Sequence, residues 1–220
     1  MKKTVLMAVF AAVILGVSGL SYAQVPKGLY AGVVGGFSIA PDLSSSITNR
    51  VQAWDSVNFD ASLKAGYLFG VKAGWQTPFT NRIMALELEL LNMGHEMDTL
   101  KNVATYPESD ADGRIYISSL MGNVIARYPS GMIHPYVGIG GGLAYLAVDE
   151  IKSGFPAFWV NSGSDVVLAY QLMAGVEIDI KKNFVIGIGY KYFDAMKATY
   201  EADYASPGTY IPAEVEVDDK

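Results

Sequence analysis

The sequence contains no cysteine and only two histidines among its 220 residues. Without cysteine, the chain forms neither a disulfide bond nor a thiolate metal site, and it cannot be a lipoprotein anchored through an acylated cysteine. Basic residues are not in excess either. The chain has 16 Lys and Arg and 22 Asp and Glu, so its formal net charge is -6. This acidic balance argues against nucleic acid as a partner, since nucleic-acid binding requires a basic face.

Long apolar runs are confined to the N-terminus. Lys2 and Lys3 precede an apolar segment over residues 5–20, and residues 21–23 have the small-x-small pattern of a cleavage site. We therefore predict a cleaved signal peptide over residues 1–23 and one mature domain over residues 24–220. An uncleaved membrane anchor is the alternative. After residue 23, no apolar run reaches the roughly 18 residues that a membrane helix requires.

Residues 166–180 alternate strictly between two kinds of side chain. One set is apolar and consists of Val166, Leu168, Tyr170, Leu172, Ala174, Val176, Ile178 and Ile180. The intervening residues are small or polar. Period two predicts a β-strand with two different faces. The segment is longer than the usual soluble strand of about five or six residues, and it suits a tilted transmembrane strand, which needs roughly ten.

Similar alternation predicts further strands elsewhere in the chain. They cover residues 28–39, 61–76, 82–93, 114–128, 133–148 and 183–195, so seven full strands are expected. The connections at 77–81, 129–132 and 181–182 are short, whereas those at 40–56, 94–113 and 149–165 are long. Short turns on one side and long loops on the other are typical of an outer-membrane barrel. A soluble β-sandwich, the alternative, has connections of mixed length at both ends.

Four segments resemble a known family. They are residues 66–74, 128–129, 135–142 and 189–193, whose shared features are patterns of glycine and aromatic residues. Their pattern resembles the outer membrane protein β-barrel domain family, which includes the small OmpA/OmpX-type and opacity-like barrels, and the resemblance covers nearly the whole mature chain. It implies an all-β fold, a single antiparallel transmembrane β-barrel of eight strands, in the outer membrane of a Gram-negative bacterium.

The end of the chain departs from this family pattern. Residues 214–218 alternate like the start of an eighth strand, but the terminal aromatic residue with which family members usually close is absent. Unpaired backbone groups cost several kcal/mol each in lipid. We therefore expect an eighth strand that is truncated at the C-terminus; an intact protein with a partial last strand is the alternative.

Charged and amide side chains fall on the face opposite to the apolar set. They are Lys64, Lys72, Glu87, Glu89, Asn123, Arg127, Gln171, Glu177, Asp179 and Lys191. An eight-stranded barrel has an interior that side chains just fill, and buried charges must be paired. We therefore predict an internal salt-bridge network. A path for protons or small ions is the alternative.

No set of residues predicts catalysis. His95 with Glu96, Asp98 and Ser109 is the nearest to a lipid-modifying site at the outer rim, but a solvated loop histidine is the simpler interpretation. His134 is expected at the opposite rim, in a short turn. Residues 108–113 match only half of a calcium-binding loop, and residues 138–142 lie within a strand, where a dinucleotide-binding motif does not occur. We predict no catalytic, cofactor or metal site, and no enzyme activity.

The expected function is that of a surface-exposed barrel with structural and recognition roles, such as adhesion or membrane integrity. Its partners are outer-membrane lipid and lipopolysaccharide, together with a surface ligand bound through loops 40–56, 94–113 and 149–165, because function collects on loops that a rigid scaffold holds. A narrow porin-like channel for small solutes or ions is the alternative, and a lipid A-modifying enzyme is a further one.

Overall fold

The computed structural model describes residues 16–18, 28–41, 43–49, 56–103, 106–149, 151–153, 159–160, 162–181, 184–196, 199–206 and 209–218, with side chains described within 28–41, 60–99, 112–149, 162–181 and 184–196. These residues are almost entirely β-strand, with one short 3-10 helix, η1 (Pro78–Thr80). None of the helical structure in these ranges is long and apolar enough to cross a membrane.

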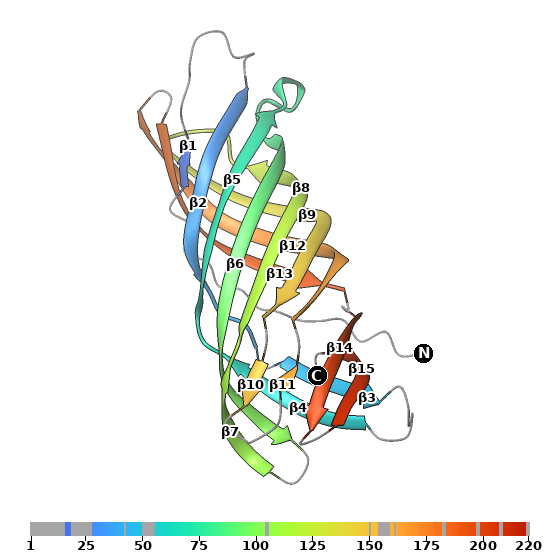
Figure 1. Ribbon diagram of the computed structural model, residues 1–220. Coiled ribbons are helices and arrows are strands. Elements are labelled where there is room, and N and C mark those ends of the chain that lie inside the picture. Colours follow the sequence, from blue (N-terminus) through green and yellow to red (C-terminus); the bar gives the residue numbers. More distant parts are fainter. Residues whose placement is uncertain are drawn as a thin grey trace.

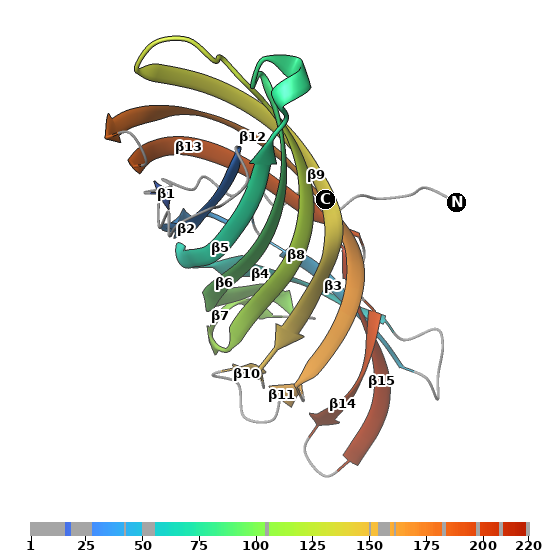
Figure 2. The same ribbon diagram turned by 90° about the horizontal axis from the view of Figure 1, so that it is seen from above.

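Eight strands form a closed antiparallel ring. In ring order they are β1 (Gly16–Ser18), β2 (Leu29–Ser38), β5 (Gly66–Gln76), β6 (Met84–Val103), β8 (Arg114–Arg127), β9 (Ile133–Val148), β12 (Gly163–Lys181) and β13 (Phe184–Ala195). The pairing of β6 with β8 joins the two halves, and β1 pairs with both β2 and β13. Seen from above, the long strands curl around a common axis (Figure 2). The predicted antiparallel barrel is therefore confirmed.

The ring has its fewest backbone pairs between β2 and β13. There β1 contributes three residues, of which Val17 pairs with both Val33 and Ile186. Among the strands that the structure describes, the remaining facing edges of β2 and β13 have no other partner. Unpaired backbone groups are costly in hydrocarbon, so this seam is the least supported part of the ring. β1 falls within the predicted signal peptide, most of which lies outside the described residues.

A second ring of strands continues the barrel on the side of the long connections. It consists of β4 (Ser56–Leu63), β3 (Leu43–Asn49), β15 (Thr209–Asp218), β14 (Thr199–Ser206), β11 (Trp159–Val160), β10 (Ile151–Ser153), β7 (Tyr106–Asp112) and the last part of β6, which pairs back to β4. Figure 1 shows these strands gathered beyond one end of the first ring. We call this group the outer ring.

The outer ring corrects the prediction that the long connections are loops. Much of residues 40–56, 94–113 and 149–165 is strand instead. Backbone N–H and C=O groups in a long connection need partners, and antiparallel pairing with the neighbouring connections provides them. The partial match to a calcium-binding loop at 108–113 is affected as well. Its residues up to Asp112 lie in the extended strand β7 and not in a loop. The prediction that residues 214–218 start the eighth barrel strand is corrected as well, because they lie in β15, which pairs with β14 and β3 in the outer ring, while β1 occupies the eighth position between β2 and β13.

One predicted strand is divided into two. Residues 61–76 were expected to run continuously, but the chain breaks at Lys64 and Ala65, between β4 and β5. Gly66 follows the break, and a side chain there would lie 2.1 Å from the carbonyl oxygen of Gly94 on β6. The close approach of β5 and β6 at this point therefore requires glycine.

The opposite end of the barrel has tight turns, as predicted. Thr77 precedes η1, and its hydroxyl donates to the carbonyl oxygen of Met84 over 2.9 Å, which ties the turn to the start of β6. Asn81 and Arg82 then adopt left-handed conformations with φ of 53° and 64°. The turn over residues 129–132 has a similar bend at Gly131, with φ of 86°. We call this side of the barrel the turn end.

The period-two pattern assigns side chains to the two faces of the wall. On β12, Val166, Leu168 and Leu172 are exposed, whereas Val167 and Gln171 are buried. The same exposed belt continues around the ring in Val33, Val71, Leu86, Leu88, Leu90, Leu120, Val124, Val137, Ile139, Leu143, Ile186 and Ile188. An apolar belt of this extent on the outside of a closed barrel is the surface that lipid covers.

We predict that a charge in the belt prevents folding into lipid. Leu88, at 57% exposure on β6, is a suitable site for Leu88→Arg. Arginine near the bilayer midplane costs about 2–4 kcal/mol in a transmembrane barrel, so the folded fraction in vesicles, measured by the mobility difference between unheated and boiled samples, should fall clearly. Met132→Arg in the exposed turn is the control. Equal folding of the two variants would contradict a lipid-facing belt.

Candidate functional site

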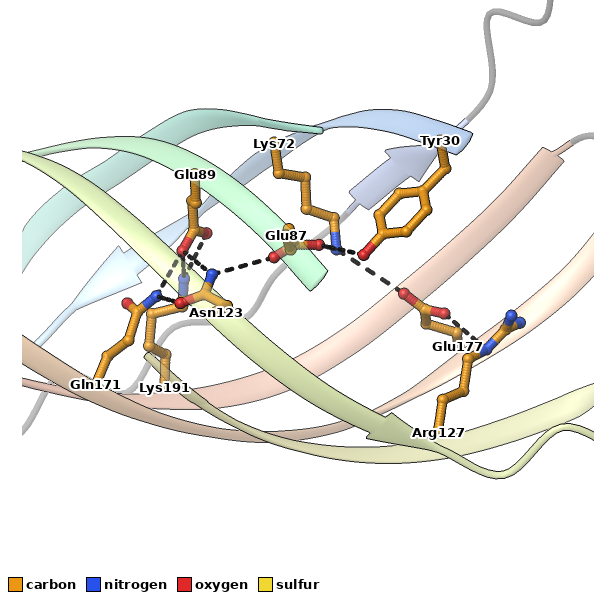
Figure 3. A network of polar contacts seen from close by, with 9 residues as sticks. All are labelled: Tyr30, Lys72, Glu87, Glu89, Asn123, Arg127, Gln171, Glu177 and Lys191. Carbon is orange, nitrogen blue, oxygen red and sulfur yellow. Dashed lines mark hydrogen bonds and ion pairs between the residues drawn. The ribbon is translucent and has the colours of Figure 1, made fainter. Parts of the chain in front are cut away.

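The interior of the barrel is the part of the molecule where charged side chains converge. They form one connected group, shown in Figure 3, that runs from the middle of the barrel to the turn end. We call it the interior network. It contains Tyr30, Lys72, Glu87, Glu89, Asn123, Arg127, Gln171, Glu177 and Lys191, and it extends to Asp179 and His134.

Glu89 is the centre of the inner half of this network. The Lys191 Nζ atom donates to both carboxylate oxygens, at 2.5 and 2.6 Å. Gln171 Nε2 donates to Oε2 over 2.8 Å, and Asn123 Nδ2 does so over 3.4 Å. These four residues come from four strands, β6, β13, β12 and β8. Both charges are almost fully buried, at 2% exposure for Glu89 and 1% for Lys191, so their hydrogen bonds compensate for the loss of water.

Glu87, two residues earlier on the same face of β6, is a second centre. Its Oε2 atom accepts a hydrogen bond from the Tyr30 hydroxyl at 3.0 Å and lies 3.2 Å from Lys72 Nζ. Its Oε1 atom accepts from Asn123 Nδ2 over 3.3 Å. The Asn123 amide therefore joins the two carboxylates, while Gln171 Nε2 donates to the Asn123 Oδ1 atom over 2.7 Å.

The network ends at the turn end with alternating charges. Lys72 Nζ lies 3.8 Å from Glu177, and Arg127 Nε lies 3.0 Å from the other oxygen of the same carboxylate. Arg127 Nη2 then contacts Asp179 at 3.3 Å, and Asp179 contacts His134 Nε2 at 3.0 Å. Each charge in this row therefore has a neighbour of opposite sign, which is the arrangement that buried charges require.

A glycine in β9 makes room for the amides. A side chain added at Gly140 would place its Cβ atom 3.0 Å from the Asn123 Cγ atom and 3.0 Å from the Gln171 Cγ atom. Both distances are shorter than ordinary carbon contacts, so the network occupies the space that the missing side chain leaves. This agrees with the sequence interpretation that glycines let strands pack in a narrow barrel.

Beyond Glu89, toward the outer ring, the interior becomes apolar. Most of the inward residues there are apolar and buried, and they are Leu68, Leu91, Met93, Met121, Val167 and Phe193, with the buried Ser119 among them. We call the six apolar residues the apolar plug. An apolar layer with a single hydroxyl has too few polar groups to replace the hydration of an ion, so the plug separates the interior network from the outer ring.

A small cavity lies at the turn end of the network. It measures about 60 Å³ and is lined by Tyr30, Gln76, Arg82, Ala85, Ile125, Arg127, Glu177 and Val185. A water molecule needs a cavity of roughly 10–15 Å³ on this scale. The cavity therefore has room for a few waters beside polar side chains.

The predicted interior residues are confirmed with one exception. Nine of the ten lie in the interior network, but Lys64 does not. It lies in the break between β4 and β5, where its side chain is half exposed and pairs with Asp98 at 3.4 Å. The break interrupts the alternation that was used to assign Lys64 to the interior. Tyr30 and His134 were not predicted as interior residues. Each occupies an inward-facing position in the alternation of its own strand, and this alternation could have identified them.

The structure contradicts both interpretations of His95. The residue is buried at 2% exposure rather than solvated in a loop. Its Nδ1–H donates to the Lys64 carbonyl over 3.1 Å, and its Nε2 atom shares a hydrogen bond of 2.9 Å with the Ser38 hydroxyl. It does not form a group with Glu96, because consecutive strand residues face opposite sides and Glu96 pairs outside with Arg114 at 3.2 Å.

The remaining two members of that candidate group are also separated from His95. Asp98 is exposed and contacts Lys64. Ser109 lies on β7, and its side chain is outside the described residues. The hydrogen bonds of His95 instead tie β2 to the break between β4 and β5, so its contacts are those of a buried structural histidine.

Comparison with known proteins gives a family and distant relatives. The family of the outer membrane protein beta-barrel domain matches residues 9–208. Uncharacterized proteins of Brucella abortus, Brucella suis and Brucella melitensis are each 26% identical over 159 residues, which covers 63% of this chain and 55% of theirs. The chain thus spans about half the length of these curated relatives. No solved structure gives a significant match.

We predict that the Glu89–Lys191 pair is strongly coupled. Glu89→Leu leaves a buried ammonium without its carboxylate, which costs about 3–5 kcal/mol, whereas a matched pair of apolar residues is often nearly neutral. The free energy of unfolding in lipid vesicles, measured by urea titration, should therefore fall in Glu89→Leu and largely recover in Glu89→Leu/Lys191→Met.

The exposed pair of Glu96 and Arg114 provides the control for this cycle. Its two side chains are more than half exposed, so Glu96→Gln should change the free energy of unfolding by less than about 1 kcal/mol. If Glu89→Leu and Lys191→Met changed the free energy of unfolding additively, that result would contradict a coupled pair.

Proposed function

Because the chain belongs to the outer membrane protein beta-barrel domain family, we propose that it works as a closed outer-membrane barrel that presents its outer ring for recognition at the cell surface. The barrel fold and the outer-membrane location follow from the family. The recognition role, the Gram-negative host and the absence of catalysis are parts of the proposal. Outer-membrane lipid and lipopolysaccharide would surround the barrel, and a surface ligand would bind the outer ring.

The filled interior is the observation that carries the proposal. The interior network and the apolar plug are stacked along the barrel axis, and their central side chains, such as Glu89, Met121 and Phe193, are almost completely buried. Eight-stranded barrels have interiors that side chains can fill without leaving a channel. A barrel closed at two successive levels supports a scaffold better than it supports a pore.

The outer ring supports recognition rather than simple anchoring. Its strands come from three connections that join different pairs of membrane strands and from the segment after β13, which contains β14 and β15, and they pair with each other. Backbone pairing holds these connections in a defined arrangement, which reduces the conformational entropy that a binding surface loses when a partner is bound. A rigid platform of this kind suits a protein ligand at the cell surface.

The two alternative functions have weaker support. The polar half of the interior and the cavity at the turn end are the features that would favour a narrow channel, but the apolar plug lies between them and the outer ring. A lipid-modifying enzyme would need His95, Glu96 and Asp98 to converge, and the described side chains point in different directions. We therefore prefer the non-catalytic scaffold.

We predict that the protein does not conduct ions until the plug is removed. In planar bilayers the wild-type protein should show no single-channel steps, whereas Leu91→Ala/Met93→Ala/Met121→Ala should show small ones, because water enters the space that the plug filled. Leu90→Ala/Leu120→Ala, on the lipid face, is the matched control and should stay silent. Steady conductance of the wild-type protein would favour the porin-like channel.

A second prediction concerns the orientation of the barrel. An epitope tag inserted between Val103 and Tyr106, where β6 and β7 join, should be labelled by antibody on intact cells. The same tag in the turn over residues 129–132 should be labelled only after the outer membrane is opened. The opposite pattern would place the outer ring in the periplasm and exclude surface recognition.

A further inference from the structure

The cavity at the turn end is lined by hydrogen-bond donors that the described protein groups do not use. Arg82 and Gln76 both line it, and within the described part of the chain neither side chain makes a hydrogen bond or an ion pair. Arg127 lines the cavity as well. Its Nε and Nη2 atoms contact Glu177 and Asp179, whereas its Nη1 atom has no acceptor among the described residues. A guanidinium carries five N–H donors and no acceptor, so donors are in surplus here.

The one carboxylate that the described lining contains is already engaged. Glu177 is contacted by Arg127 at 3.0 Å and by Lys72 at 3.8 Å. The Tyr30 hydroxyl, also in the lining, donates its proton to Glu87 over 3.0 Å. Two arginines and one carboxylate give the lining a net charge of +1. A ligand that fits this lining accepts hydrogen bonds and carries a negative charge.

The backbone at Arg82 is an independent indication that this residue has a role in the cavity. Its φ of 64° lies in the left-handed region, which few residues other than glycine and asparagine adopt. The Arg82 N–H donates to the Thr77 carbonyl over 3.3 Å, so the turn before β6 maintains this conformation. Unfavourable backbone conformations that the surrounding structure maintains are concentrated at binding sites. The turn thus holds an exposed arginine beside the cavity.

The size and the apolar part of the lining limit what the ligand can be. The cavity of about 60 Å³ holds about four to six water-sized groups on the scale of 10–15 Å³ for each. Ala85, Ile125 and Val185 form the rest of its wall, and they offer contacts to a small alkyl group. The planar fork of an arginine matches the geometry of a carboxylate. A carboxylate on a short alkyl group meets all of these conditions.

We propose that the cavity at the turn end binds the carboxylate of a short aliphatic group. Arg82 and Arg127 donate to its two oxygens, Gln76 provides a further donor, and the alkyl group contacts Ala85 and Ile125. A free acid such as acetate and the C-terminus of a peptide that ends in a small residue present the same chemistry. The site lies at the opposite end of the barrel from the outer ring, so it is additional to the proposed recognition role.

A titration of the whole protein in detergent micelles with sodium acetate tests the site. The amide NMR signals of the cavity-lining residues are followed at constant pH and ionic strength. We expect saturable shifts with a Kd of roughly 1 mM, because a ligand of about four heavy atoms makes few contacts. Acetamide has a similar shape and no charge, and it should bind at least about tenfold more weakly. Equal binding of acetamide, or no saturable shift with acetate, would overturn the proposal.

Three variants locate the binding in this cavity. Arg82→Gln removes one guanidinium from an exposed turn, and it should bind acetate about tenfold more weakly. Arg114→Gln removes an exposed arginine at the opposite rim and should bind acetate as the wild-type protein does. Ala85→Leu fills the cavity and should abolish binding, with folding checked by the mobility difference between unheated and boiled samples. Unchanged affinity in Arg82→Gln would contradict the site, even if Ala85→Leu does not fold.

A second probe, N-acetylalanylalanine, distinguishes the two sources of the carboxylate. Tighter binding than acetate supports the site and assigns it to a peptide C-terminus, whereas weaker binding supports the site and assigns it to a free acid. Inorganic phosphate that binds more tightly than either probe would contradict a carboxylate site. None of these measurements involves the outer ring, so the proposed recognition role and the carboxylate site can fail separately.

Discussion

Backbone pairing in a closed ring is the constraint on which the rest of the structure depends. In hydrocarbon, each N–H and C=O group must find its partner within the protein, and the antiparallel ring satisfies this requirement except along the seam between β2 and β13, where β1 pairs over three residues at most. β6 has the largest part in it, because it pairs with β5 and β8 in the membrane and then with β4 and β7 in the outer ring. The two rings are thus a continuous wall.

Closing a ring of eight strands creates a second requirement, because its narrow interior must be filled largely by side chains. The sequence meets it in two ways along the axis. Near the outer ring, most inward positions are apolar, and the buried His95 has hydrogen-bond partners in Ser38 and Lys64. Toward the turn end the inward positions are charged, and every charge is placed next to one of opposite sign, with Asn123 and Gln171 bridging the carboxylates and glycine making room for them.

These features connect the fold with the proposed function. A pore needs a continuous polar path, and this barrel interrupts the path with an apolar layer. The polar groups of the described interior converge on one another. What the barrel leaves available is its lipid-facing belt and the paired strands of the outer ring, and these are the surfaces that the proposed recognition role would use.

The alternation of side chains was enough to predict the strands, the lipid face and nine of the ten interior residues, since a period of two fixes which face each residue occupies. The same rule could have found Tyr30 and His134, and it could have separated His95 from Glu96. The sequence alone did not determine the break at Lys64, the strand pairing within the long connections, or the position of the plug relative to the network. Those depend on which strands become neighbours and in what register, and contacts between residues distant in sequence decide both.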